Sequence, residues 1–456
     1  MGTTAGDPRD VEALAPLLER EESTRQEQSC RQGCSVSGGV ANLTVTAVGA
    51  GMLALPKAFA TVGMALGLSL VVFVTCLAYF STGIIVKYAA QSKARSYGEL
   101  IKAEFGPLGA LILHLAITVH VGGVMVVYLI IIADVLVGGA PEFGGVLPTL
   151  LNRHDNPWFL CRPIVVAVLV LGVVVPMLIP RSLTSVARFS RTSIVMVLLL
   201  ATTICSLAIR ALTLGEVGPG VHVLPSFADI ADGSIRGVAT ALLTVVSVSA
   251  MAFTCHFNLL PIQQSLKDPR GCTMLCVIRR TLLLCAAFYT TVAMSGYLLF
   301  GSKTYGDVLK NLNFSFVSGL VPRALAHALI DVVAFCYTFN LLVNFCLKVW
   351  AVRENVSEMA LKAPALQLSR RTFYQLTLLL VMAAYALSIV VPSMWVLVSL
   401  VGSTACVTFS YVFPGLLVLR RDSRPLWRTA AGGMIVLAAV MAVLAIFNTL
   451  CGHGGL

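Results

Sequence analysis

Two glycines and a proline interrupt an apolar stretch near the start of the chain. The string is VGAGMLALPKAF, residues 48–59, and it contains Gly49, Gly51 and Pro56. Glycine lowers the penalty for irregular backbone and proline removes a backbone donor, so we expect a broken helix whose free amides and carbonyls could bind a polar ligand or an ion. In a membrane such groups survive only where they line a polar cavity. The alternative is a proline kink with close glycine packing between helices.

A second interruption follows in the string SVSAMAFTCHFNLLP, residues 247–261. It places Thr254, His256 and Asn258 ahead of Pro261 but lacks the glycines of the first string. This segment comes five membrane spans after the first, so it would run antiparallel to it, as expected for two inverted repeats of five helices. The alternative is that His256 and Asn258 simply emerge into the cytoplasmic interface.

These two segments must be positioned by a membrane protein. Of the 456 residues, 57% are hydrophobic and only 12% are charged, which excludes a soluble globular protein. Because a bilayer-spanning helix needs about 20 apolar residues, the sequence predicts an all-α polytopic membrane protein with about 11 transmembrane helices, the first and sixth of them broken. The predicted spans are 36–59, 64–89, 108–138, 164–180, 190–213, 236–258, 280–300, 324–350, 373–391, 394–419 and 429–450.

The positions of Lys and Arg give the expected orientation. They gather in the loops after the even-numbered spans and are fewer after the odd-numbered ones. Cytoplasmic loops carry the excess of positive charge, so we expect a cytoplasmic N-terminus. The boundaries that follow are a disordered cytoplasmic tail over 1–34, a membrane domain over 35–450 and a short non-cytoplasmic tail over 451–456. Asn313 begins a glycosylation sequon in a non-cytoplasmic loop, where it would be modified.

Four motifs in order resemble the amino acid/auxin permease family. They are Gly49 to Phe59 after Asn42-Leu, Ser96-Tyr-Gly-Glu-Leu, Thr254-Cys-His-Phe-Asn, and Gly296-Tyr-Leu-Leu-Phe-Gly ahead of Asp307. Within that family the chain is most similar to sodium-coupled neutral amino acid transporters and to vacuolar amino acid transporters. The resemblance covers nearly the whole membrane domain. It implies a five-plus-five inverted repeat with an eleventh helix, and transport of amino acids by alternating access coupled to Na⁺ or H⁺.

An amino acid presents a carboxylate and an ammonium, and one broken helix can bind both. Free amides near the first break would receive the carboxylate, while freed carbonyls and polar side chains would receive the ammonium. The expected substrate-binding residues are Gly49, Ala50, Gly51, Met52, Thr254 and His256.

Two sets of residues compete for the role of coupling site. The resemblance implies Asn42 and Thr338 as Na⁺ ligands, although Asn42 could equally hydrogen-bond a neighbouring helix. His327 and Asp331 lie four residues apart on one helical face and are candidates for a proton relay. The alternative for this pair is wetting at the membrane interface.

Other classes of function find little support. The sequence has no nucleophile beside a base, no metal-ligand cluster and no phosphate-binding loop, so we expect no enzyme and no cofactor. The expected partners are an amino acid and the lipid bilayer, with no nucleic acid and no obligate protein partner. An amino-acid sensor with little transport is the alternative function. Both a vacuolar or lysosomal membrane and the plasma membrane fit the topology.

Overall fold

The computed structural model describes residues 34–49, 51–139, 143–151, 158–181, 183–224, 230, 233–363, 365–391 and 393–450. This part of the chain is almost entirely helical, and its strands are β1 (Gly138–Gly139) and β2 (Phe143–Gly144), which pair antiparallel. The all-α prediction is therefore confirmed. Residues 1–33 and 451–456 lie outside the described residues, so the predictions for the two tails stay predictions.

The helices follow the predicted spans closely. In chain order they are α2 (Val36–Ala47), α3 (Gly51–Val62), α4 (Met64–Ser92), α5 (Tyr97–Val137), α6 (Val146–Leu150), α7 (Arg162–Leu169), α8 (Val175–Leu178), α9 (Leu183–Leu214), α10 (Ile235–Ala252), α11 (Leu259–Ser265), α12 (Gly271–Phe300), α13 (Phe314–Leu320), α14 (Arg323–Val356), α15 (Arg370–Val390), α16 (Met394–Val401), α17 (Phe413–Arg421) and α18 (Pro425–Leu450). Short π or 3₁₀ segments join or flank several of them, including η2 (Val170–Val174), η4 (His256–Asn258), η6 (Val308–Asn311), η9 (Gly402–Cys406) and η10 (Thr408–Val412).

Each predicted span overlaps one or more helices. Within the described residues, nine stretches are long and apolar enough to cross a membrane, and the pair α2 and α3 forms one further span bent by 63°. The stretch Arg162–Leu178 is apolar but shorter than the others. The second predicted interruption is also present, since α10 and α11 are separated by residues 253–258.

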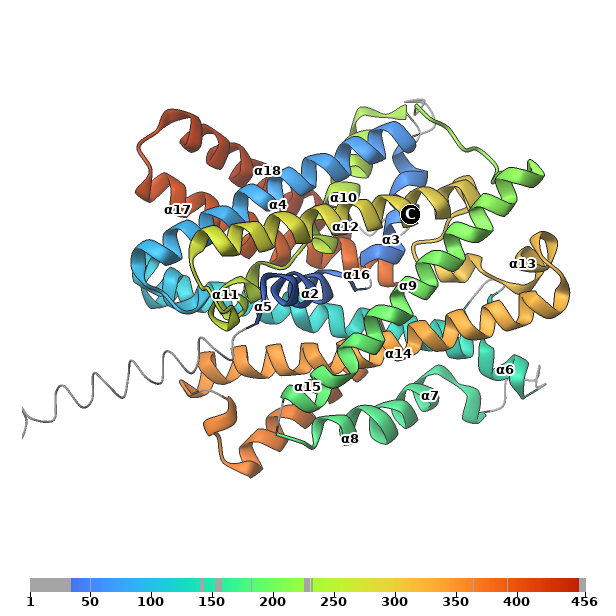
Figure 1. The fold of residues 1–456 in the computed structure, drawn as a ribbon, viewed down its shortest axis with the longest axis horizontal. Helices are drawn as coiled ribbons and strands as arrows, with labels where there is room; N and C mark the ends of the chain where they lie inside the picture. Colours follow the sequence, from blue (N-terminus) through green and yellow to red (C-terminus); the bar gives the residue numbers. More distant parts are fainter. Residues whose placement is uncertain are drawn as a thin grey trace, which may run out of the picture.

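Burial separates inner from outer helices. In α5 72% of the apolar window is buried, whereas in α15 and α18 only 22% is buried. A helix that is apolar on all sides and buried belongs to the interior of the bundle, while an apolar helix left exposed faces lipid. Figure 1 shows α2 and α3 near the centre, with the long helices α4, α12 and α14 around them. Helix α12 packs against α2, α3 and α4, and α14 packs against α5 and α9.

Both helix breaks begin before the prolines that the sequence singled out. Pro56 lies inside α3 and Pro261 lies in the first turn of α11. A proline in the first turn removes an amide that has no helical partner anyway, so Pro261 fits without disruption. The irregular backbone comes earlier, after Ala47 and after Ala252.

Candidate functional site

The two helix breaks touch each other through glycine. Gly51 begins α3, and a Cβ added to it would lie 2.9 Å from both the Cα and the Cβ of Ala252, the last residue of α10. Real Cβ atoms do not approach backbone this closely, so only glycine permits the contact. Residues that lie about two hundred positions apart in the sequence are thus brought into one place.

One tyrosine hydroxyl joins both breaks. Tyr289 of α12 is fully buried, and its Oη lies 2.9 Å from the carbonyl oxygen of Ala47 and 2.9 Å from that of Ala252. These carbonyls belong to the last residues of α2 and α10 and have no partner within their own helices. The hydroxyl has a single proton, which the two carbonyls share. Tyr289 therefore holds the two helix ends together.

The carbonyl end of α10 is closed mainly by the residues that follow it. The Phe253 amide donates to Ser249 at 3.1 Å, and the Thr254 amide donates to Met251 at 3.2 Å. The Thr254 hydroxyl donates to the Ala250 carbonyl at 2.8 Å and also contacts the Cys406 thiol at 2.8 Å. Thr254, predicted to bind substrate, thus caps α10 in this structure.

The carbonyl end of α2 depends more on distant residues. Among the described residues of the adjoining chain, the Val48 amide donates to Thr44 at 2.8 Å. The Thr46 carbonyl receives Lys348 Nζ of α14 at 3.4 Å. The Thr46 hydroxyl receives the Asn258 side-chain amide at 3.2 Å, which ties this helix end to the second break.

The predicted substrate residues of the first break lie together and are buried. A Cβ on Gly49 would lie 2.5 Å from the Tyr128 hydroxyl of α5, and Met52 is fully buried. The start of α3 carries amides that no preceding helical turn can satisfy, and a helix of this length presents a partial positive charge there. Ala50 lies outside the described residues. The Met52 amide donates to the Gly49 carbonyl at 3.4 Å. The first break therefore places the first amides of α3 close to the carbonyls that end α2.

His256 lies within the second break and contacts other elements. Its Nε2 lies 2.7 Å from the Ser81 hydroxyl of α4, and its ring packs edge-on against Phe409 and Tyr411. Only 1% of His256 is exposed, and its Nδ1 has no hydrogen-bond partner within the described part of the chain. In this conformation His256 joins η4 to α4 and η10.

Comparison with known proteins identifies the family. A model of the transmembrane amino acid transporter proteins matches residues 32–453. The chain belongs to this family. It is 30% identical to the amino acid transporter AVT6C of Arabidopsis thaliana over 447 residues, which cover 96% of this chain and 99% of that protein. It is 31% identical to the Arabidopsis amino acid transporter AVT6B over 96% of this chain and 94% of that protein.

A third relative comes from an animal. The sodium-coupled neutral amino acid transporter 7 of Danio rerio is 25% identical over 95% of this chain and 89% of its own length. The resemblance drawn from the four motifs is confirmed. The chain is a multi-pass membrane protein of an amino acid transporter family and not an enzyme.

No hydrogen bond of the described residues links Asn42 and Thr338, the two residues predicted to bind Na⁺. Asn42 is exposed on α2, where its backbone carbonyl receives the Thr46 hydroxyl at 3.0 Å. Thr338 of α14 is buried, and its hydroxyl has no hydrogen-bond partner among the described residues. Their role as ion ligands stays a prediction.

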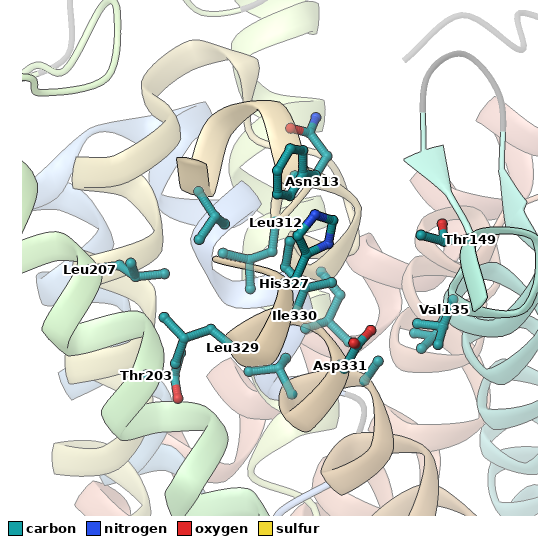
Figure 2. A pocket seen from close by; sticks show the side chains of 16 residues that line it. Val135, Thr149, Thr203, Leu207, Leu312, Asn313, His327, Leu329, Ile330 and Asp331 are labelled. Carbon is teal, nitrogen blue, oxygen red and sulfur yellow. The ribbon is translucent and has the colours of Figure 1, made fainter. Parts of the chain in front are cut away.

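The predicted proton relay lines a pocket on α14. Figure 2 shows His327 and Asp331 on this helix beside Asn313 and Thr149, in a pocket built from α5, α6, α9, α13 and α14. Both relay residues are exposed, and the His327 ring stacks on Phe314 with the ring centroids 4.0 Å apart. The structure thus places the pair in one pocket whose lining does not include the two helix breaks.

A cluster of charged side chains lies at the C-terminal end of α5, near this pocket. Asp134 is buried and forms ion pairs with Arg162 at the start of α7 and, at 2.8 Å, with Lys310 of η6. Asp307 nearby is also buried and accepts the Leu309 amide at 3.0 Å. Burial raises the pKa of Asp307 to about 6, against the opposing effects of that amide and of Lys310.

Sequence reasoning missed Tyr128, Tyr289 and Lys348. A tyrosine in an apolar span looks like any other aromatic residue of a helix. Lys348 offered a signal, since an ionisable residue inside a membrane span is a candidate for function. The sequence ended span 8 near residue 350, which would leave this lysine at the interface, whereas α14 continues to Val356.

Proposed function

We propose that the protein is a secondary active transporter that moves neutral amino acids across a membrane by alternating access, coupled to a Na⁺ or a proton gradient. The observation that carries the proposal is the junction of the two helix breaks, where Gly51 meets Ala252 and Tyr289 contacts both helix ends. Membership of an amino acid transporter family supports the substrate class.

The junction has groups for both ends of a zwitterion. The amides that begin α3 would receive the carboxylate, since a helix N-terminus favours negative charge. The carbonyls of Ala47 and Ala252 would receive the ammonium. In this structure the Tyr289 hydroxyl lies on those carbonyls, so the ammonium would compete with it for the same two oxygens.

Movement is needed to reach this site. Gly49, Gly51 and Met52 are buried, so an amino acid enters or leaves only when helices separate on one side. On the side where α2 begins, the Cys34 amide donates to the Ser265 carbonyl at 2.7 Å, and the Lys267 amide donates to Cys34 at 2.9 Å. This pairing ties the start of α2 to the end of α11. We expect these two half-helices to move together.

The proposed orientation places the N-terminus in the cytoplasm and Asn313 on the opposite side, in a vacuolar or lysosomal membrane or in the plasma membrane. The Asn313 side-chain oxygen accepts the Phe316 amide at 2.9 Å, which leaves its nitrogen available for a glycan. A glycosidase-sensitive form that disappears in Asn313→Gln supports this orientation. Labelling of a cysteine at position 313 from the cytoplasmic side would contradict it.

Uptake into liposomes tests the function. The purified protein is reconstituted, and a panel of labelled amino acids is offered with Na⁺ and proton gradients imposed separately. Uptake of neutral amino acids under either gradient supports the proposal. Saturable amino acid binding without uptake under any gradient would contradict it and favour a sensor.

A further inference from the structure

Lys348 is a buried cation in the middle of the transport domain. Only 9% of the residue is exposed, although it lies within α14, a helix that crosses the membrane. Its Nζ lies 3.4 Å from the Thr46 carbonyl oxygen and 5.3 Å from the centre of the Phe257 ring. These contacts come from the end of α2 and from η4, which lies within the second break.

Within the described part of the chain, no carboxylate forms an ion pair with this lysine. The ion pairs of the described residues involve Asp134, Glu104, Asp268 and Asp422, and none of them includes Lys348. Removing an ammonium from water without a counter-charge is expensive, so chains rarely place one in a membrane without a functional reason. The compensation here comes from a carbonyl and an aromatic face.

The Lys348 ammonium lies at the carbonyl end of α2, where a bound cation would otherwise be expected. The last carbonyls of a helix carry a partial negative charge, and in transporters with broken helices such half-helix ends are where a coupling cation is held. At the end of α2, Thr44 and Ala47 are bonded by Val48 and Tyr289, and Thr46 is bonded by Lys348. The charge that a free cation would supply at this end is already present on a side chain.

We propose that the Lys348 ammonium is a built-in cation that takes the place of a coupling Na⁺ at the carbonyl end of α2, so that amino acid transport by this chain does not require sodium. The inference rests on the proposed transport function, and it removes Na⁺ from the possible coupling ions. A second cation at the same helix end would be repelled by the ammonium. The Asn42 and Thr338 assignment would then not describe a sodium site.

The first experiment uses the unmodified protein in liposomes. Uptake of a labelled neutral amino acid is compared in Na⁺ and in choline media of equal ionic strength, with a proton gradient present in both. We expect rates that agree within about twofold. A fall of about tenfold or more on removing Na⁺, a coupling typical of linked sites, would overturn the proposal.

Variants test the residue itself. In choline medium, uptake by Lys348→Ala is expected to fall by about tenfold or more, which is within the range of coupling between linked sites. Adding Na⁺ or ethylammonium should restore part of this uptake. Lys348→Arg keeps the charge and should retain uptake. Lys87→Ala, which removes a cation paired with Asp422 at 3.0 Å, is the control and should show no rescue by either cation. Unchanged uptake by Lys348→Ala in choline would overturn the proposal.

Thermal unfolding separates this inference from the proposed function. If Lys348 takes the sodium position, exchanging choline for Na⁺ should leave the melting temperature of the unmodified protein unchanged. A saturable stabilisation by Na⁺ overturns the inference even if Lys348→Ala fails to fold. Absence of uptake in every medium would refute transport, while this measurement would still decide the sodium question.

Discussion

The two helix breaks meet at one junction but are closed in different ways. At the end of α10, three of the last four carbonyls are bonded by Phe253 and Thr254, which directly follow the helix. At the end of α2, one bond comes from the described residues that follow it, the Val48 amide, and Lys348 and Tyr289 supply two more. The second break therefore contains most of its own stabilisation, whereas the first depends on other helices.

This difference predicts different roles for the two breaks when the helices move. Bonds between neighbouring residues persist when helices move apart, because the same segment carries donor and acceptor. Bonds from α12 and α14 to α2 are lost or exchanged when those helices separate. We therefore expect the first break to respond to the amino acid ligand, while the second supplies a fixed surface against which it closes.

The largest expected effect comes from separating the two breaks. In Gly51→Ala the new Cβ would lie 2.9 Å from Ala252 Cα, so the backbones must move apart. Displacement of a binding site by about an ångström can cost about 100-fold in rate, and we expect a loss of that size in liposome uptake. Gly122→Ala in α5 is the control, since nothing lies within 4 Å of its added Cβ. Normal uptake by Gly51→Ala would show that the contact is not needed.

A smaller loss is expected when the shared hydroxyl is removed. Tyr289→Phe keeps the ring but leaves the Ala47 and Ala252 carbonyls without a donor. Since hydrogen bonds inside membranes contribute about 0.6 to 1.7 kcal/mol, we expect uptake to fall about tenfold. Tyr97→Phe removes another buried hydroxyl, which donates to Phe409 at 2.7 Å, and serves as the matched control. Equal losses in the two variants would mean that Tyr289 has no special role at the junction.

The fold and the location of the breaks could be predicted from sequence. Apolar length fixed the spans, charge placement gave the expected orientation, and Gly49 and Gly51 marked the first break. The weaker polar signal of Thr254 and His256 marked the second, where the helix does end at Ala252. These features depend on local composition, which a single sequence contains in full.

The hydrogen bonds from other helices to the breaks could not be predicted in the same way. Tyr289 and Ala47 are 242 positions apart, and Lys348 and Thr46 are 302 positions apart. Such pairs depend on which helix faces meet, and nothing in the local pattern of an apolar helix specifies that. For the same reason Thr254 and His256 were correctly located near a break, but their contacts with Cys406 and Ser81 were not foreseen.

Asp307, which belongs to neither break, should dominate the change in stability between about pH 4 and pH 6. Burial raises the pKa of Asp307 to about 6, while an unfolded aspartate titrates near 3.9. Between these values the unfolded chain releases the proton first, so stability falls as the pH rises from about 4 to about 6. Asp307→Asn removes this effect and should be more stable than the parent above pH 6, by about 3 kcal/mol, with the difference vanishing near pH 4.

Thermal unfolding across this pH range checks the prediction. The melting temperatures of the parent and of Asp307→Asn should diverge as the pH rises, and Asp268→Asn is a control because that carboxyl is on the surface and its pKa is lowered by Arg270. Parallel curves for the parent and Asp307→Asn would show that Asp307 does not titrate in this range. A change in amino acid affinity in Asp307→Asn would link this carboxyl to the breaks.

The smallest effects should distinguish the breaks most directly. Thr254→Val removes the hydroxyl that closes α10 at Ala250, and Thr46→Val removes the one that receives Asn258 at the end of α2. Thr254→Val also loses the contact with the Cys406 thiol, and Thr46→Val also loses the bond to the Asn42 carbonyl. Each variant thus loses two contacts inside the membrane, each of about 0.6 kcal/mol on average. We expect Thr254→Val to lower the melting temperature with KM unchanged, because the fixed break loses only stability. Thr46→Val should instead change KM, because the end of α2 must rearrange when the amino acid binds. The reverse pattern would assign the responsive role to the second break.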